Sequence, residues 1–278
     1  MKKTILTFLL CTITLIFTGT QAFAHNLWIN PADHFPRVGD TVDVAIAWGH
    51  TYNANRLDQE MKQGNLAYIK IQDPDGKDVK PVTVSETQYK LKIEKAGVYT
   101  VTAGIKPGVF TKTPEGRKWS DKRGLANPIS CTTFSIEAKT LIIAGGKDKN
   151  LGGKTGQDLE LIPLSNPKNV KAGDQFNVMV LFKGKPAADV TVNAAYAGFA
   201  QEGKTMDVAP HNPEKAKDEK AKGPHFPTSA VTGKDGKATL TLSKKGYWMV
   251  SICHKTPYPD KTVCDEYMNN MAFTFEIK

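Results

Sequence analysis

The sequence lacks the compositional marks of several protein classes. With 23 Gly, 16 Pro and 9% aromatic residues among 278, it has neither a collagen repeat nor the bias of a disordered chain. It contains no His-Glu-x-x-His, no Gly-x-Ser-x-Gly, no phosphate-binding loop and no dinucleotide fingerprint. Nothing therefore indicates hydrolytic chemistry, and we expect a protein that is not an enzyme.

The chain also lacks a concentrated charge of one sign. Its net charge of +9 comes from 37 Lys and Arg against 28 Asp and Glu, and the densest basic run, 215–222, also contains acidic residues. Such a run is typical of a solvated loop. No recognition helix or stacking motif accompanies the charge, so we expect no nucleic-acid partner.

Long hydrophobic runs are confined to the first residues. Two lysines precede an apolar stretch, 4–17, and Ala22-Phe-Ala24 supplies the small residues that signal peptidase needs. The stretch is short for a membrane span and no second one follows, so we expect no stable membrane insertion. The pattern predicts a signal peptide over 1–24, cleaved after Ala24, and export to a bacterial periplasm.

Strands are predicted along most of the remaining chain, because apolar and polar residues alternate with a period of two. Clear examples are 42–48, 66–72 and 98–103, and the turn Asp73-Pro-Asp-Gly76 is well suited to close a hairpin. No segment offers an amphipathic helix of three turns with an apolar face. The predicted fold is all-β, with at least about 35% of residues in strands.

A glycine- and lysine-rich segment divides the predicted strands into two series. Short strands at this spacing favour β-sandwiches. We expect two tandem β-sandwich domains, 25–140 and 159–278, joined by a linker over 141–158. A long polar stretch, 203–229, is predicted to be an insertion in the second domain.

Cysteines are few, and three remain after the predicted cleavage: Cys131, Cys253 and Cys264. Three pairings are possible for one disulfide. We favour Cys253–Cys264, because the residues between them are rich in turn formers and can bring two strand ends together. Cys131 lies in an expected strand and is then a buried thiol, or alternatively a soft metal ligand.

The predicted cleavage would expose His25 as the first residue of the mature chain. The α-amine and imidazole Nδ1 of an N-terminal histidine can form one chelate ring, and a further imidazole completes a three-nitrogen set suited to Cu, Ni or Co. The α-amine titrates near pH 8 and is readily deprotonated by a metal. Two alternatives stay open: His25 follows the cleavage site by chance, or cleavage occurs after Ala22.

A partner for His25 follows from a hypothetical strand register. If 25–30 and 43–50 are adjacent antiparallel strands with Trp28 opposite Ala47, then His25 lies opposite His50. Directly opposed Cβ atoms are about 5 Å apart, within reach of a shared ion. The alternative for His50 is a strand-end imidazole that hydrogen-bonds to the backbone.

The other histidines are weaker candidates. His34 lies in a connection close in sequence to the proposed site, and His254 ends a predicted strand of the second domain. Both are candidate further metal ligands, although a surface turn position suits His34 as well. His211 and His225 lie in the polar insertion, where solvated histidines are common.

Several segments, taken in order, resemble a known family. They include Ala24-His-Asn-Leu-Trp28, Pro36-Arg-Val-Gly39, Trp48-Gly-His50 and Gly246-Tyr-Trp-Met-Val250. Together they are similar to the periplasmic components of cobalt or nickel uptake systems, many of which are classed under a domain of unknown function. The resemblance implies Ig-like or carboxypeptidase-regulatory-like sandwiches. It also implies binding of a divalent transition metal (Ni, Co or Cu) and an inner-membrane metal transporter as partner.

Two other functions compete with metal binding. One is a carbohydrate- or protein-binding sandwich in which tryptophans stack on a ligand; the chain has Trp28, Trp48, Trp119 and Trp248. The other is a copper oxidase with an N-terminal histidine brace, since oxygen chemistry can use the same ligands. Metal titration distinguishes the first from metal binding, and oxygen consumption tests the second.

Overall fold

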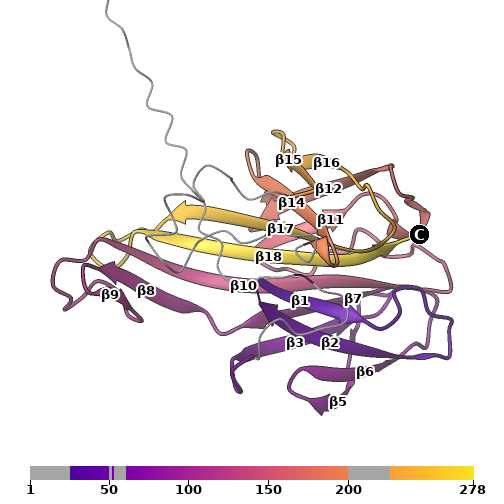
Figure 1. Cartoon of the computed structure of the whole chain (residues 1–278). Coiled ribbons are helices and arrows are strands. Elements are labelled where there is room, and N and C mark those ends of the chain that lie inside the picture. Colours follow the sequence, from indigo (N-terminus) through magenta and orange to yellow (C-terminus); the bar gives the residue numbers. More distant parts are fainter. Residues whose placement is uncertain (1–25, 50–51, 53–60, 200–225) are drawn as a thin grey trace, which may run out of the picture.

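The structure, a computed structural model, describes residues 26–49, 52, 61–199 and 226–278 (Figure 1). Strands make up 55% of these residues, and the structure contains the short 3-10 turn Pro167–Asn169. The predicted all-β fold, with at least about 35% strand, is therefore confirmed. The described part of the chain contains no helix that is long and apolar enough to cross a bilayer.

The first of three layers is a sheet of antiparallel strands in the order β1-β2-β6-β5. Its strands are β1 (Asn26–Pro31), β2 (Thr41–Gly49), β6 (Gln88–Lys92) and β5 (Val82–Ser85). In β2, Val42, Val44 and Ile46 are buried whereas Asp43 is exposed. This alternation places one face of the sheet on a core and the other in water.

The middle layer is a long sheet in the order β15-β14-β17-β18-β10-β7-β3-β4, with the β8–β9 hairpin attached to β10. Its strands are β3 (Leu66–Gln72), β4 (Asp78–Val79), β7 (Gly97–Ile105), β8 (Gly108–Thr113), β9 (Gly116–Lys118), β10 (Ser130–Ala144), β14 (Thr191–Tyr196), β15 (Thr228–Val231), β17 (Gly246–Pro257) and β18 (Glu266–Ile277). β10 and β18 run parallel, with Thr132 beside Glu266 and Thr140 beside Thr274.

The third layer is a smaller antiparallel sheet in which β12 lies between β11 and β16, with the short β13 at its end. Its strands are β11 (Leu159–Pro163), β12 (Gln175–Phe182), β13 (Lys185–Pro186) and β16 (Lys237–Thr241). Phe176 of β12 stacks on Phe275 of β18, with ring centroids 4.5 Å apart. This contact packs the third sheet on the central one.

The two outer sheets cover opposite faces of the central sheet, as the alternation of side chains in β10 shows. Ile142 packs in the core between the first and central sheets. Its neighbour Leu141 packs in the core between the central and third sheets. The chain therefore forms two β-sandwiches that share a sheet. The β8–β9 hairpin and the adjoining end of β10 extend beyond both outer layers (Figure 1).

The central sheet continues through the region where the sequence predicts a linker. β10 extends to Ala144, so the first residues of 141–158 belong to a strand, and the others form turns and irregular segments that lead to β11. β18 lies against β10, so both predicted strand series contribute to one sheet. Most of the predicted insertion, 203–229, lies outside the described residues.

Candidate functional site

The first strand has the register that the sequence predicts. β1 pairs with β2 from Asn26 beside Gly49 to Pro31 beside Val44, and Trp28 lies beside Ala47. His25 and His50 lie outside the described residues, as do the predicted signal peptide and the insertion histidines. The contact between His25 and His50 therefore stays a prediction, whereas the register on which it depends is confirmed.

His34 is a buried side chain in the connection that follows β1. Its Nδ1 lies 2.7 Å from the Leu141 carbonyl oxygen, so Nδ1–H donates and the neutral ring keeps a bare Nε2. Nε2 has no hydrogen-bond partner among the described residues. Burial lowers the pKa of His34 to about 4, although the Leu141 hydrogen bond and Asp33 act in the opposite direction. The imidazole is thus held neutral inside the fold.

His254 lies on β17, far from His34. Its ring meets Phe182 at a centroid distance of 4.6 Å, and burial lowers the pKa of His254. His34 lies instead beside Tyr247, which is seven residues earlier in β17, or roughly 23 Å along a strand. The two further candidate ligands are not brought together. No group of three or more His, Cys, Asp or Glu side chains in the described part of the chain is arranged to hold a metal ion.

The buried state of His34 predicts a pH dependence of stability. In the unfolded chain His34 takes up a proton near pH 6.5, whereas in the folded chain it does so near pH 4, so the unfolded state binds more protons between these values. The free energy of unfolding should fall by about 3 kcal/mol from this residue as the pH drops through that range.

Urea unfolding at pH 7 and at pH 4 measures this effect. The control is His34→Asn, whose amide nitrogen can replace Nδ1 as donor to Leu141. The nearby acidic groups Asp33 and Glu276, and the phenol of Tyr247, are present in both proteins. The variant should therefore lose about 3 kcal/mol less than the native chain on acidification. Equal losses would contradict the assignment.

The predicted disulfide is wrong. Cys264 is bonded to Cys131, with Cα atoms 4.9 Å apart, and Cys253 is free and buried. The reason is that β17 continues past Cys253 to Pro257, so Cys253 lies beside Asn270 of β18, six residues further along the chain than Cys264. The parallel pairing of β10 with β18 places Cys131 next to Cys264 instead.

Cys253, and not Cys131 as predicted, is the buried free thiol. Burial raises the pKa of the Cys253 thiol to about 11, so it stays protonated at neutral pH. A protonated buried thiol is a poor nucleophile and a poor metal ligand. The bonded pair, in turn, fits a protein that folds in an oxidising compartment.

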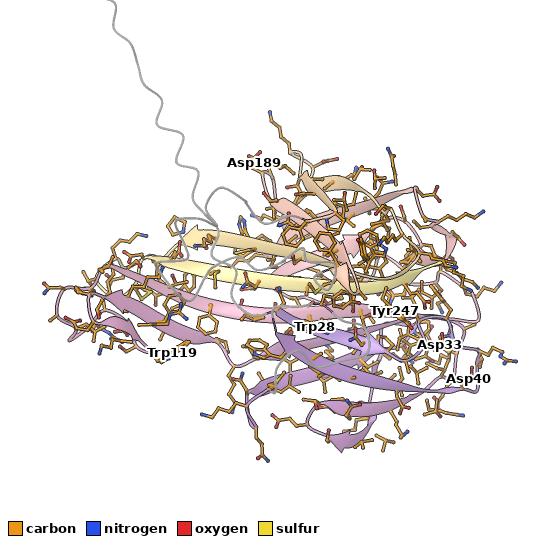
Figure 2. All side chains as sticks on the ribbon, viewed as in Figure 1. Trp28, Asp33, Asp40, Trp119, Asp189 and Tyr247 are labelled. Carbon is orange, nitrogen blue, oxygen red and sulfur yellow. A yellow bond between two sulfur atoms is a disulfide. The ribbon has the colours of Figure 1, made fainter. Side chains whose placement is uncertain are left out.

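The tryptophans divide between core and surface. Trp28 and Trp248 are both 0% exposed, and the partly buried Trp48 packs against the core between the first and central sheets. Trp119 is 69% exposed and lies just after β9, edge-on to Phe110 and Phe134. Figure 2 shows Trp28 between the layers and Trp119 near the β8–β9 hairpin. Of the four, Trp119 is thus the one largely available to a ligand.

An open groove of about 770 Å³ lies over the central sheet where β10 changes partners. β7 pairs with β10 from Glu137 onward, and β8 pairs with it up to Phe134. Between β7 and β8 lies Pro107, which has no N–H to continue a ladder. The side chains of Ser135 and Glu137 line the groove at this break in pairing.

One wall of the groove is built by Tyr68 of β3. Tyr68, Gly104 and Glu137 lie side by side on β3, β7 and β10. The tyrosine ring passes over Gly104, where an added Cβ would lie 2.5 Å from Tyr68 Cε1. Because Gly104 leaves this space, the Tyr68 hydroxyl reaches across β7 and donates to Glu137 Oε1 at 2.7 Å.

The second wall is the segment before β11, which a buried ion pair fixes to the sheet. Lys139 Nζ lies 2.9 Å from Glu160 Oε1, and both side chains are nearly inaccessible, at 1% and 3% exposed. The Thr155 N–H and hydroxyl donate to the same oxygen at 2.6 and 2.8 Å. From this segment Gln157 Nε2 donates to the Tyr68 hydroxyl at 3.2 Å, joining the two walls.

The far end of the groove carries a pair of tyrosines. The rings of Tyr258 and Tyr267 lie 4.6 Å apart and both line the groove. On the floor, the Ser135 hydroxyl donates to Asn269 Oδ1 at 3.0 Å. Ser135 is therefore bonded to an amide rather than to a base that would activate it as a nucleophile.

The carboxylates of the groove have no cationic partner among the described residues. Burial raises the pKa of Glu137, the Tyr68 hydrogen bond lowers it, and the charge of Asp158 raises it further. Lys70, on the same wall as Tyr68, is paired with Asp78 at 3.3 Å. The groove thus offers acceptors and donors beside aromatic rings, an arrangement that can bind a polar ligand.

No sequence motif indicates this groove. Its residues come from five strands, β3, β7, β8, β10 and β18, and from three connecting segments, and none belongs to a recognised motif. A local signal does exist: Ser135 and Glu137 are polar residues on the same face of β10 as the core residues Leu141 and Ile143. Polar residues in such a position indicate that the covering layer ends there.

Comparison with known proteins gives one family match. The model of a domain of unknown function, DUF4198, matches residues 22–256. Nothing among the curated proteins matches the sequence.

Among solved structures, the D0-D1 domain of Intimin is similar, at 11% identity over 88% of this chain and 96% of that chain, with a TM-score of 0.21. Murine CEACAM1b matches at 8% identity over 91% and 99%, with a TM-score of 0.21. The Escherichia coli adhesin FdeC matches at 18% identity over 90% and 64%, with a TM-score of 0.20. At these TM-scores the similarities assign no function, and the fold rests on the strand order described above.

Proposed function

The chain belongs to the DUF4198 family, whose name assigns no activity, and we propose that it is a periplasmic, non-enzymatic protein that binds a divalent transition metal. His25, as the mature N-terminus, and His50 are the proposed ligands, and the ion is nickel, cobalt or copper. In this proposal the protein receives the ion outside the inner membrane and presents it to a metal transporter there.

The register of β1 and β2 carries this proposal. Six consecutive pairs follow the predicted register, and the last joins Asn26 to Gly49. The residues that come next in the sequence are His25 on one side and His50 on the other. An α-amine, its own Nδ1 and a second imidazole form a nitrogen set that favours late first-row divalent metals, copper most strongly. Selectivity for nickel or cobalt would then depend on metal availability.

The proposal predicts that one residue added before His25 weakens metal binding at least tenfold, about 1.4 kcal/mol. The extension moves the α-amine out of the chelate ring and leaves the imidazole in place. His50→Ala should have a similar effect, because it removes the other imidazole. Calorimetric titration of the mature protein with Ni(II), Co(II) and Cu(II) measures both changes, after mass spectrometry has confirmed the N-terminus.

The control is Val82→Ala on β5, an exposed position without a metal-binding group, which should bind metal as tightly as the native chain. His254→Ala tests the further candidate ligand on β17, whose ring lies against Phe182. A loss of affinity in this variant would add His254 to the ligand set. An extended protein that binds Ni(II) and Cu(II) as tightly as the native one would refute the N-terminal site. Oxygen consumption by the copper-loaded protein with a reductant would instead favour the copper oxidase.

A further inference from the structure

The groove over β10 has no part in the proposed metal site, and we propose that it binds a neutral, hydroxyl-rich ligand of saccharide size. The volume of about 770 Å³ lies within the range of small-molecule sites. The groove is open to solvent, so a ligand can extend beyond it. This suits a chain of sugar units better than a compact ion.

Aromatic rings line the groove at intervals. Tyr68 lies at one wall, Phe134 at the break between β7 and β8, and Tyr267 at the far end. Tyr68 and Tyr267 are each more than one third exposed. Such rings combine a large apolar face with a polar hydroxyl. They can cover the C–H face of a sugar while the edges of the sugar stay hydrogen-bonded.

The polar groups between these rings include both donors and acceptors. Glu137 and Asp158 accept, Lys70 donates, and the Asn269 amide does both. An anion would face the carboxylates of Glu137 and Asp158, whereas the Lys70 ammonium already pairs with Asp78. Hydroxyl groups both donate and accept, and hydrogen bonds from hydroxyls to carboxylates are among the stronger ones. The lining therefore favours a polyol over an anion, and the spermidine measurement described below separates a polyol from an organic cation.

The groove is held in shape before any ligand arrives. Tyr68 is bonded to both Glu137 and Gln157, and the Lys139–Glu160 pair anchors the segment that carries Gln157. A wall fixed in this way loses little conformational freedom on binding. Gly104 is the residue that permits this arrangement, because a side chain there would displace the Tyr68 ring.

Calorimetric titration of the mature protein with maltose, cellobiose, lactose and N,N′-diacetylchitobiose tests the proposal. At least one of these sugars should bind with a Kd below about 10 mM. Gly104→Ala, which displaces Tyr68, and Glu137→Gln, which removes the charged acceptor and keeps the shape, should each weaken that binding at least about tenfold. Glu137→Gln also keeps the test decisive if Gly104→Ala fails to fold.

The control variant is Val82→Ala on β5, an exposed position in the first sheet. It should bind the sugar as the native chain does. Absence of binding by all four sugars overturns the proposal, as does equal binding by native protein and Glu137→Gln. Binding of spermidine in place of the sugars would also overturn it, in favour of an organic cation. Unchanged Ni(II) affinity in Glu137→Gln would show that the groove and the metal site are separate.

Discussion

Replacing Cys131 and Cys264 together by alanine is expected to lower the free energy of unfolding by about 2–5 kcal/mol. The bond joins residues separated by 133 positions, so its loss returns a large conformational freedom to the unfolded chain. The bond also ties the start of β10 to Cys264. The next residue, Asp265, makes two hydrogen bonds with Cys131: its backbone N–H donates to the Cys131 carbonyl oxygen, and its carboxylate accepts from the Cys131 N–H. Urea unfolding followed by tryptophan fluorescence measures the difference.

The matched control is Cys253→Ala, which removes a buried thiol without breaking a bond. It should cost about 1 kcal/mol, the usual size for a single buried substitution. Thiol counting on the denatured, unreduced mature protein should find one free thiol and map it to Cys253. A double variant with the urea midpoint of the native protein, or a reactive Cys131, would show that the bond is absent.

Lys139→Met should destabilise the protein by about 3–5 kcal/mol, because it leaves the Glu160 carboxylate buried without its cation. Burial lowers the pKa of Lys139, and the Glu160 carboxylate counteracts this shift. The ammonium group also donates to the Gly153 carbonyl at 3.3 Å, so its loss frees the segment that forms one wall of the groove. Thermal and urea unfolding measure the loss.

An exposed ion pair provides the control for this effect. Lys149 is 63% exposed and pairs with Asp75, so Lys149→Met should cost at most about 1 kcal/mol. The double variant Lys139→Met/Glu160→Gln should recover most of the loss, since a glutamine still accepts from Thr155 and carries no charge. If Lys139→Met costs no more than Lys149→Met, the pair does not anchor the fold.

Features that depend on short stretches of sequence were predictable. The bounds of β3 match the predicted segment 66–72, and the predicted segments 42–48 and 98–103 lie within β2 and β7, because alternation and flanking turns mark them. Asp73-Pro-Asp-Gly76 forms the predicted turn between β3 and β4, with Gly76 in the left-handed region at φ +75°. Even the β1–β2 register was accessible, since one short connection joins the two strands.

Features that depend on distant pairing were not predictable. Nothing in the alternation of β10 or β18 indicates that they lie side by side, and the disulfide prediction failed for this reason. The groove depends on the same pairing, because Asn269 of β18 meets Ser135 of β10 only in that register. A sequence pattern indicates which residues are buried, but it does not indicate which strands they pack against.

The parallel pairing of β10 with β18 bears on how the protein is made. Residues that pair across it, such as Thr132 and Glu266, are 134 positions apart. Pairings of this separation close a large loop and form late in folding. During synthesis β10 leaves the ribosome long before β18, and until then one edge of β10 presents unpaired N–H and C=O groups to which foreign strands can add. We therefore expect the partly made chain to be prone to aggregation until residues 266–277 have been added.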